Sequence, residues 1–319
     1  MLKVENLHKY FEMKKRITVN AVNGINFSIN DGETFGLVGE SGCGKTTVGK
    51  CILRLYEPTN GKIFFLGKDI TSIKKKELKN FRTKVQVVFQ EPYDSLNPRK
   101  VVRQIVEDPL KRTGRLNSTE RNKKLIEVLH MVGLNEKYLN KFPIQLTQGE
   151  QQRIGVARAL ITNPRLIVLD EPTSLLDIRF RAEIVVLFKR LQKELGTAYL
   201  FVSHDLVVIA QLSHRIAVMY LGRIVEEGPT GNVFKSPAHP YTKALLAASL
   251  FPDPNQKRNK LLLKGEVPSP VNLPNNRCNL ASRCPLVDKC CYESLPELLK
   301  IEDQHFVACF KVQSKRQIG

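Results

Sequence analysis

Short apolar segments occur at intervals along the first 90 residues and predict β-structure there. Positions 25–29 alternate between apolar and polar residues, which is the period of a strand with one buried face. Segment Thr34–Val38 predicts a buried strand, and 85–89 predicts another strand. Asn60-Gly61, placed before the segment Lys62–Leu66, predicts a hairpin turn.

The middle of the chain has the longer period of helices. Apolar residues at positions 125, 128, 129 and 132 follow the spacing of one helix face, and Gly133 is suited to end that helix. A second helix is predicted over 179–195, with Gly196 at its end. Continuous apolar runs at 166–169 and 198–202 predict buried strands, and 216–226 predicts a small hairpin.

After about Pro237 this pattern breaks down. Prolines and cysteines become frequent between Pro268 and Pro296, which is typical of an appended module. The chain has seven cysteines, an odd number, and five of them lie in its last fifth. In a protein that is not exported, this distribution favours a metal or iron–sulfur site over a disulfide framework.

The composition is that of a globular protein. Of the 319 residues, 42% are hydrophobic and 25% are charged, which excludes disordered, collagen-like and disulfide-stapled chains. No apolar run approaches the ~20 residues of a membrane span, and no apolar signal-peptide core follows the start. We therefore expect a chain that neither crosses a bilayer by itself nor is secreted.

The charge is strongly positive. The 50 Lys and Arg residues against 31 Asp and Glu give a formal net charge of +19. Nucleic-acid binding and residence against the anionic cytoplasmic face of a membrane both account for such an excess. A generally basic proteome accounts for it too, and charge alone does not separate the three.

The strongest motif is segment 39–46, which fits G-x-x-x-x-G-K-[ST] and follows the predicted strand Thr34–Val38. Its glycines let backbone N–H groups curl around phosphate oxygens, and the following helix N-terminus adds partial positive charge. Lys45 can reach the β- and γ-phosphates, and the Thr46 hydroxyl can ligate Mg²⁺. The alternative is a glycine-rich turn that fits by chance. The predicted ATP-binding residues are Gly39, Glu40, Ser41, Gly42, Cys43, Gly44, Lys45, Thr46 and Thr47.

Polar residues also follow three other predicted strands. Asp170-Glu171 ends the run 166–169, where one acid can hold the magnesium shell and the other can orient or deprotonate the attacking water. His204 follows 198–202 and can donate a hydrogen bond to the γ-phosphate. Gln90 follows 85–89 and can ligate Mg²⁺ or the water. Each also has a structural alternative, such as a solvated strand end or a strand cap.

The order of these motifs resembles an ATPase subunit of ABC transporters. Leu146-Thr147-Gln148-Gly149-Glu150 lies between Gln90 and Asp170-Glu171, and Ser174-Leu175-Leu176-Asp177 precedes His204. The resemblance covers about residues 1–235. It implies an α/β fold with a P-loop core, an antiparallel β subdomain and a helical subdomain at about 91–159.

The remaining segment, 236–319, is similar to the C-terminal extension of the oligopeptide, dipeptide and nickel importer ATPases. The resemblance rests on Ser-Pro-Ala-His-Pro-Tyr-Thr at 236–242 and on the cysteine-rich tail. It implies a second domain over 236–319. It also implies that Phe11, or alternatively Tyr10, stacks on adenine. The residues implied for Mg²⁺ are Thr46, Gln90 and Asp170, and those implied for catalysis are Lys45, Gln90, Glu171 as general base and His204.

Two such subunits sandwich two ATP molecules, each between one phosphate loop and the partner's Leu-Ser-Gly-Gly-Gln element. The resemblance places Thr147, Gly149 and Asp177 against the partner's ATP. This chain departs from the element, because Gln148 replaces a glycine and Glu150 replaces a neutral amide with a charge that phosphate repels. Our hypothesis is that the chain pairs with a different ATPase subunit. The site built on its own Lys45 and Glu171 would be the competent one, and the other site would be slower. Tolerated drift is the alternative.

The resembled branch carries Cys-x5-Cys-x6-Cys and a later cysteine, which bind a [4Fe–4S] cluster in some members. This implies Cys278, Cys284, Cys291 and Cys309 as ligands and leaves Cys290 spare. Four thiolates suit Zn²⁺ equally well, and reduced, unliganded cysteines are the alternative.

The implied partners are a second ATPase subunit, two integral membrane permeases and an extracellular solute-binding protein. They imply peripheral attachment to the cytoplasmic face of the membrane. The cargo stays open among oligopeptides, dipeptides, nickel and metal chelates. One rival is an ABC ATPase acting on nucleic acid, although no long insertion supports it. The other is a non-catalytic regulatory subunit, against which the intact Lys45, Asp170, Glu171 and His204 argue.

Overall fold

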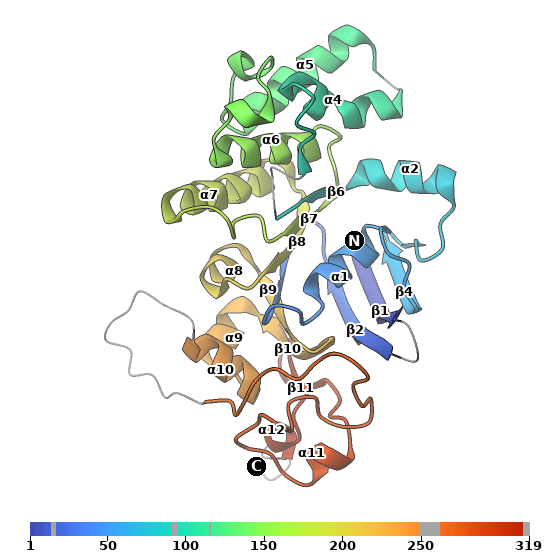
Figure 1. Ribbon diagram of the computed structural model, residues 1–319, viewed down its shortest axis with the longest axis vertical. Helices are drawn as coiled ribbons and strands as arrows, with labels where there is room; N and C mark the ends of the chain where they lie inside the picture. Colours follow the sequence, from blue (N-terminus) through green and yellow to red (C-terminus); the bar gives the residue numbers. More distant parts are fainter. Residues whose placement is uncertain (14–16, 91–94, 115, 249–261, 315–319) are drawn as a thin grey trace. The chain divides into compact units, whose positions relative to one another are not determined.

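The computed structural model describes residues 1–13, 17–90, 95–114, 116–248 and 262–314 (Figure 1). The chain divides into two compact units. Unit 1 takes Met1–Ile29, Thr34–Ser72 and the described residues from Val202 onward. Unit 2 takes Asn30–Glu33 and the described residues of Ile73–Phe201. The boundary expected between two domains, 1–235 and 236–319, stays a prediction. Residues 91–94, at the start of the predicted helical subdomain, lie outside the described residues.

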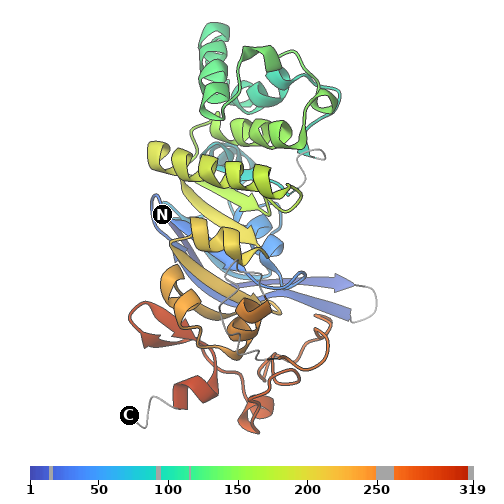
Figure 2. The ribbon, with the colours of Figure 1, turned by 90° about the vertical axis from the view of Figure 1, so that its left-hand side faces the viewer.

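Unit 1 contains an antiparallel sheet in the order β2-β1-β4-β5. Its strands are β1 (Leu2–Met13), β2 (Ile17–Ile29), β4 (Asn60–Phe65) and β5 (Lys68–Asp69). Figure 2 shows β1 and β2 as a long twisted pair. The alternation predicted at 25–29 is confirmed, because Ile25, Phe27 and Ile29 are buried. The antiparallel β subdomain was therefore correctly inferred.

The hairpin predicted at Asn60-Gly61 is wrong. Both residues belong to β4, and the turn that follows β4 lies at Leu66-Gly67. Gly61 is needed for a different reason: its φ is +90°, and a Cβ there would lie 2.1 Å from the Asn6 carbonyl oxygen. The glycine marks a close approach of β4 to β1, which from sequence alone looks the same as a turn.

Unit 1 also contains five strands of a mixed sheet, in the order β11-β12-β10-β9-β3. β3 (Thr34–Val38) pairs parallel with β9 (Arg215–Tyr220), and all of β3 is buried. The strands β10 (Arg223–Pro229), β12 (His305–Val307) and β11 (Leu299–Glu302) pair antiparallel. The helices of unit 1 are α1 (Lys45–Ile52), α8 (Leu206–Leu212), α9 (Thr230–Lys235), α10 (Pro240–Ala248), α11 (Cys290–Glu293) and α12 (Phe310–Ser314).

The C-terminal residues of unit 1 are bound to its N-terminal sheet. The Asn20 amide donates to the Pro270 carbonyl at 3.2 Å, and the Asn272 amide donates to the Thr18 carbonyl at 2.8 Å. The Asn23 side chain donates to Asn275 Oδ1 at 2.7 Å. Segment 270–275 therefore runs along β2 and is fixed by backbone and side-chain hydrogen bonds.

Unit 2 contains the strands β6 (Val85–Val88), β7 (Leu166–Asp170) and most of β8 (Ala198–Ser203). β6 and β7 are parallel, and every residue of β7 is buried, as its continuous apolar run predicts. The helix α7 (Ile178–Leu195) ends at Gly196 in the left-handed region, at φ 63°, as predicted. The remaining helices of unit 2 are α2 (Lys75–Lys84), α4 (Val102–Thr113), α5 (Ser118–Met131) and α6 (Gln148–Leu160), with short 3₁₀ turns at Glu136–Tyr138 and Pro143–Gln145.

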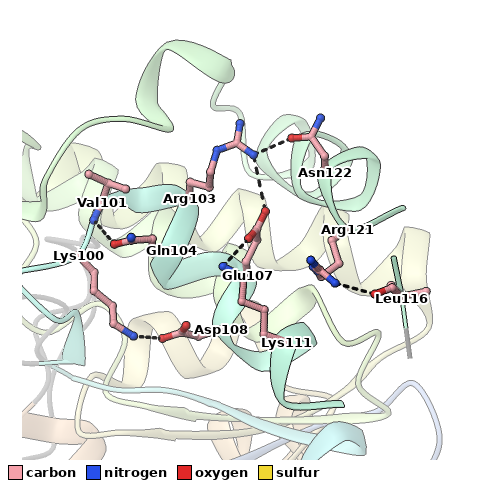
Figure 3. A network of polar contacts seen from close by, with 10 residues as sticks. All are labelled: Lys100, Val101, Arg103, Gln104, Glu107, Asp108, Lys111, Leu116, Arg121 and Asn122. Atoms are coloured by element: carbon pink, nitrogen blue, oxygen red, sulfur yellow. Dashed lines mark hydrogen bonds and ion pairs between the residues drawn. The ribbon is translucent and has the colours of Figure 1, made fainter. Parts of the chain in front are cut away.

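The helices α4 and α5 are joined by a polar network (Figure 3). Glu107, which is buried, forms ion pairs with Arg103 at 3.6 Å and Lys111 at 3.0 Å. Arg103 also donates to Asn122 Oδ1 on α5 at 2.7 Å. Asn117 caps α5 by accepting from the Glu120 amide. These contacts, with the buried face of α5 at Leu125, Val128 and Leu129, hold the helices together. The described residues of 95–159 form helices, turns and loops and contain no strand.

No helix in the described part of the chain combines the length and the apolar character needed to cross a membrane.

Candidate nucleotide site

The predicted phosphate loop connects β3 to α1 in unit 1. Gly39, Gly42 and Gly44 all have positive φ values, at 152°, 79° and 105°. At two of them space is also absent: a Cβ would lie 2.2 Å from the Met219 carbonyl oxygen at Gly39, and 2.0 Å from the Ala21 carbonyl oxygen at Gly44. The loop therefore depends on glycine for both its conformation and its packing.

Lys45 opens α1 and turns back into this loop. Its side chain is buried, and its ammonium group donates to the carbonyl oxygens of Gly39 at 2.8 Å and Glu40 at 2.9 Å. The Cys43 sulfur lies 3.6 Å from the same nitrogen. A buried cation held by neutral carbonyls is well placed to receive a phosphate anion.

The two aromatic candidates on β1 differ in their surroundings. The Phe11 ring is partly exposed and meets the Tyr56 ring edge-on at 5.3 Å, with the Lys9 ammonium 5.0 Å from its centre. The Tyr10 hydroxyl instead donates to Asn23 Oδ1 at 3.0 Å and lies 2.7 Å from His8 Nδ1. Of the two, Phe11 has the ring that is not tied into a hydrogen-bond network.

The acidic pair Asp170-Glu171 lies at the end of β7 in unit 2. Asp170 is the last strand residue and is buried, whereas Glu171 leaves the strand with a left-handed φ of 49°. That conformation is uncommon for a residue other than glycine. The Glu171 carbonyl accepts from the Ser174 amide at 3.3 Å and from its hydroxyl at 3.1 Å. The turn after the strand thus sets the direction in which the chain leaves Asp170.

Gln90 and His204 follow their strands as predicted. Gln90 comes after β6 in unit 2 and is exposed. His204 comes after β8, within unit 1, and is exposed between Ser203 and Asp205, whose side chain caps α8. Unit 1 therefore carries the phosphate loop, Phe11 and His204. Unit 2 carries the other predicted residues: Gln90, Thr147, Gly149, Asp170, Glu171 and Asp177.

The departing element at 146–150 begins helix α6. Thr147 is its N-cap and Gly149 is buried, where a Cβ would lie 3.1 Å from the Phe180 ring. Gln152, also buried, donates to the Pro172 carbonyl at 2.8 Å and so connects α6 to the segment after Asp170. Asp177 caps α7 by accepting from the Arg179 and Phe180 amides, each at 3.0 Å.

The tail cysteines are gathered in unit 1, and all are free thiols. The Cys278 amide donates to the Cys291 carbonyl at 3.0 Å. Burial raises the pKa of Cys278 to about 11, and the charges of Cys291, Cys309 and Cys284 add to the rise. Nevertheless, in the described part of the chain no three or more His, Cys, Asp or Glu side chains form a group that could hold a metal ion.

Comparison with known proteins identifies the family. The family model for the ABC transporter domain matches residues 22–174, and that for the C-terminal region of oligopeptide/dipeptide transporters matches 225–291. The chain is 42% identical over 318 residues to the oligopeptide transport ATP-binding protein AppF of Bacillus subtilis, covering 97% of this chain and 96% of that one. The chain belongs to the ATP-binding subunits of ABC transporters.

Other members of this ABC family match over nearly the whole length. The dipeptide transport ATP-binding protein DppF of Haemophilus influenzae is 39% identical over 317 residues, covering 98% of this chain and 97% of that one. Among solved structures, the ATP-binding cassette MJ0796, a dimer bound to ADP and phosphate, superposes with a TM-score of 0.66 and 33% identity. The match includes 72% of this chain and 99% of the cassette.

These matches confirm the family, the α/β fold class and the ATPase activity inferred from the motifs. ATP and Mg²⁺ are the general requirements of such an ABC ATPase. The whole-length relatives are transport proteins, so the nucleic-acid interpretation of the charge is not supported.

Sequence reasoning missed two residues of this ABC subunit that contact the phosphate loop. Tyr241 and Arg283 both reach Glu40, from 201 and 243 residues away in the chain. The His-Pro-Tyr element indicated only a resemblance, because no local pattern reveals a contact at that separation.

Proposed function

We propose that this chain supplies the energy of ATP hydrolysis to an importer of oligopeptides or dipeptides. The observation that carries the proposal is the match at both ends of one chain, to the ABC domain at 22–174 and to the oligopeptide/dipeptide C-terminal region at 225–291. Nickel and metal chelates are the other cargo classes within the same resemblance.

In this proposal unit 1 binds the nucleotide. The adenine stacks on Phe11, and the phosphates lie in the loop Gly39–Thr47. The Lys45 ammonium, held in place by the Gly39 and Glu40 carbonyls, donates to β- and γ-phosphate oxygens. The buried, preorganised position of Lys45 supports this role, because little reorganisation separates the loop from its occupied form.

Mg²⁺ would be held by Thr46, Gln90 and Asp170. A hydroxyl, an amide oxygen and a carboxylate are hard oxygen donors, so the set fits this ion, which would neutralise charge on the β- and γ-phosphates. Glu171 would orient and deprotonate the attacking water, and His204 would donate a hydrogen bond to the γ-phosphate. The left-handed backbone of Glu171 supports a functional demand on that residue.

The partners proposed are a second, different ATPase subunit, two membrane permeases and an extracellular solute-binding protein. Thr147, Gly149 and Asp177 would face the ATP bound to the second subunit. The resulting location is the cytoplasmic face of the membrane. The dimeric cassette among the similar structures supports the pairing of two ATPase subunits.

The tail would hold a [4Fe–4S] cluster or Zn²⁺ on Cys278, Cys284, Cys291 and Cys309. Burial raises the pKa values of Cys278 and Cys284, and neighbouring cysteines add to both rises, which supports the grouping. The side chains as they stand do not form a metal-holding set, so no step of ATP hydrolysis is assigned to such a group.

The experiment is to reconstitute the complete transporter in proteoliposomes and to measure ATP-dependent uptake of labelled di- to pentapeptides and nickel. Peptide uptake that is lost in the Lys45→Ala variant is expected. ATP hydrolysis that responds to DNA and not to the membrane subunits would contradict the proposal.

A further inference from the structure

One residue of the phosphate loop is held by the C-terminal extension at two points. The Glu40 amide donates to the Tyr241 hydroxyl at 2.9 Å, and the Glu40 carboxylate pairs with Arg283 at 3.3 Å. All three residues belong to unit 1. Glu40 also accepts from Lys45 through its carbonyl, so its amide, carbonyl and side chain each have a partner.

The Tyr241 contact fixes the orientation of the peptide that joins Gly39 to Glu40. In a trans peptide the C=O and N–H groups point in opposite directions. Because Tyr241 holds the N–H, the Gly39 carbonyl faces the other way, toward the Lys45 ammonium at 2.8 Å. Gly39 has the backbone freedom to let this peptide flip. The tyrosine hydroxyl therefore stabilises the orientation that aims Lys45.

Tyr241 is itself rigidly held. It is fully buried at the start of α10, and its ring packs against the Tyr220 ring with centres 4.6 Å apart. Its amide donates to His239 Nδ1 at 3.1 Å. A hydroxyl on a ring fixed in this way is a defined anchor rather than an adaptable surface contact.

Arg283 offsets the negative charge of Glu40 within the phosphate loop. A carboxylate beside a triphosphate repels it, and Glu40 places one there. The Arg283 side chain is 10% exposed, lies over the Tyr220 ring at 5.9 Å and contacts the Tyr220 hydroxyl at 3.4 Å. Arg283, next to Cys284 in the cysteine-rich segment, thus places a positive charge beside the Glu40 carboxylate.

We infer that Tyr241 and Arg283 are positioning residues of the phosphate loop, which orient its first peptide and neutralise Glu40 so that the loop accepts Mg-ATP. The inference rests on the proposed role of Gly39–Thr47 in binding the triphosphate. Through these two residues the C-terminal extension would raise the affinity for nucleotide, in addition to any role in assembly.

The test is calorimetric titration of the full-length chain with Mg-ATP, at low and at high salt. Tyr241→Phe and Arg283→Gln should each weaken binding about tenfold while both variants stay folded. Glu40→Gln, introduced into the Arg283→Gln background, should restore affinity to within about twofold, because it removes the uncompensated charge. Arg283→Lys should keep most of the affinity, and the Arg283→Gln defect should shrink at high salt.

Steady-state hydrolysis by the assembled transporter gives a second readout. A positioning role raises the KM for ATP about tenfold in both variants and leaves kcat within about twofold, since it affects the bound ground state and the transition state alike. Matched controls are Tyr292→Phe and Arg277→Gln, two exposed tail residues that should not change either value.

The inference and the proposed function can fail separately. Wild-type binding that is lost in Lys45→Ala, together with normal binding by the Tyr241 and Arg283 variants, overturns the inference alone. A Glu40→Gln change that fails to rescue Arg283→Gln also overturns it. If the wild-type chain itself binds no Mg-ATP, both are overturned.

Discussion

Thr147 and Glu150 cap helix α6 with a reciprocal pair of hydrogen bonds. The Glu150 amide donates to the Thr147 hydroxyl at 3.3 Å, and the Thr147 amide donates to the Glu150 carboxylate at 2.8 Å. The Tyr138 hydroxyl donates to the same carboxylate at 2.7 Å. Although burial alone would raise the pKa of Glu150, these hydrogen bonds lower it, so the carboxylate stays charged.

This geometry separates two effects of Glu150 on the element that would face the partner's ATP. Glu150→Gln keeps an acceptor for the capping bonds and removes the charge, so we expect hydrolysis by the assembled transporter to rise about fivefold. Glu150→Ala, as a control for the cap, should lower the free energy of unfolding by about 1 kcal/mol. An unchanged rate in Glu150→Gln would favour tolerated drift over a functional asymmetry.

Glu171→Gln should trap bound ATP. The amide keeps the shape of the side chain but cannot accept a proton from water, so hydrolysis should fall at least about a hundredfold while ATP affinity is kept. The measurement is retention of radiolabelled ATP together with peptide uptake. Glu194→Gln, an exposed acid on α7, is the matched control. Normal uptake in Glu171→Gln would support the regulatory-subunit alternative.

The phosphate-loop glycines should differ in their tolerance of a methyl group. Gly44→Ala places a Cβ 2.0 Å from the Ala21 carbonyl oxygen, so the backbone must shift, and we expect a loss of about 3 kcal/mol or more of unfolding free energy. At Gly42 nothing lies within 4 Å, and only the positive φ is unfavourable, so Gly42→Ala should cost about 1 kcal/mol. Urea denaturation measures both, and equal losses would contradict the packing argument.

The extension should lose stability in mild acid. Burial lowers the pKa of His239 from 6.5 to about 4, despite the opposing charge of Glu226. Between these values the unfolded chain binds a proton that the folded chain does not, so stability is full above pH 6.5 and declines as the pH falls toward 4. The difference amounts to about 3 kcal/mol. Glu226, whose pKa is lowered by its hydrogen bonds, acts in the same direction.

The variant that isolates the histidine is His239→Asn, whose Oδ1 can accept the Tyr241 amide in place of Nδ1. Its unfolding free energy between pH 6.5 and 4 should depend on pH with a slope about one proton smaller. The same slope as in the wild type would show that His239 is not the titrating group.

Anaerobically purified protein should contain either iron with inorganic sulfide or zinc, bound to the tail. The metal would displace the protons of its four thiol ligands, including those of Cys278, Cys284 and Cys309, whose pKa values are raised by burial in the free protein. Cys284→Ser should lose the metal, and Cys290→Ser should keep it. Metal-free wild-type protein would instead mean that these are structural thiols.

Sequence patterns predicted best the elements that have one dominant physical signal. The runs predicted at Thr34–Val38 and 166–169 lie in the fully buried strands β3 and β7, because short apolar runs between turn residues are typical of strands buried on both faces. Gly196 ended α7 as predicted because its left-handed conformation is a local property.

The patterns were insufficient where distant parts of the chain decide. Gly61 serves a close approach to Asn6 and not a turn, and a glycine carries no mark that distinguishes the two. The phosphate loop could be predicted from its motif, since the residues that define it lie within eight consecutive positions. Its support by Tyr241 and Arg283 could not, because only the folded chain brings them to Glu40.

Glu226 has a consequence for any attempt to shorten this protein. Its carboxylate has no solvent exposure and accepts from the amides of Ala238 and His239 at 2.8 and 2.9 Å, and it lies 2.8 Å from His305 Nε2. All three partners follow Lys235, the last residue of α9 and the predicted end of the first domain. A chain truncated after Lys235 would bury the Glu226 carboxylate without these partners, which is strongly destabilising. Such a fragment would therefore represent the natural subunit poorly in crystallisation or inhibitor screening.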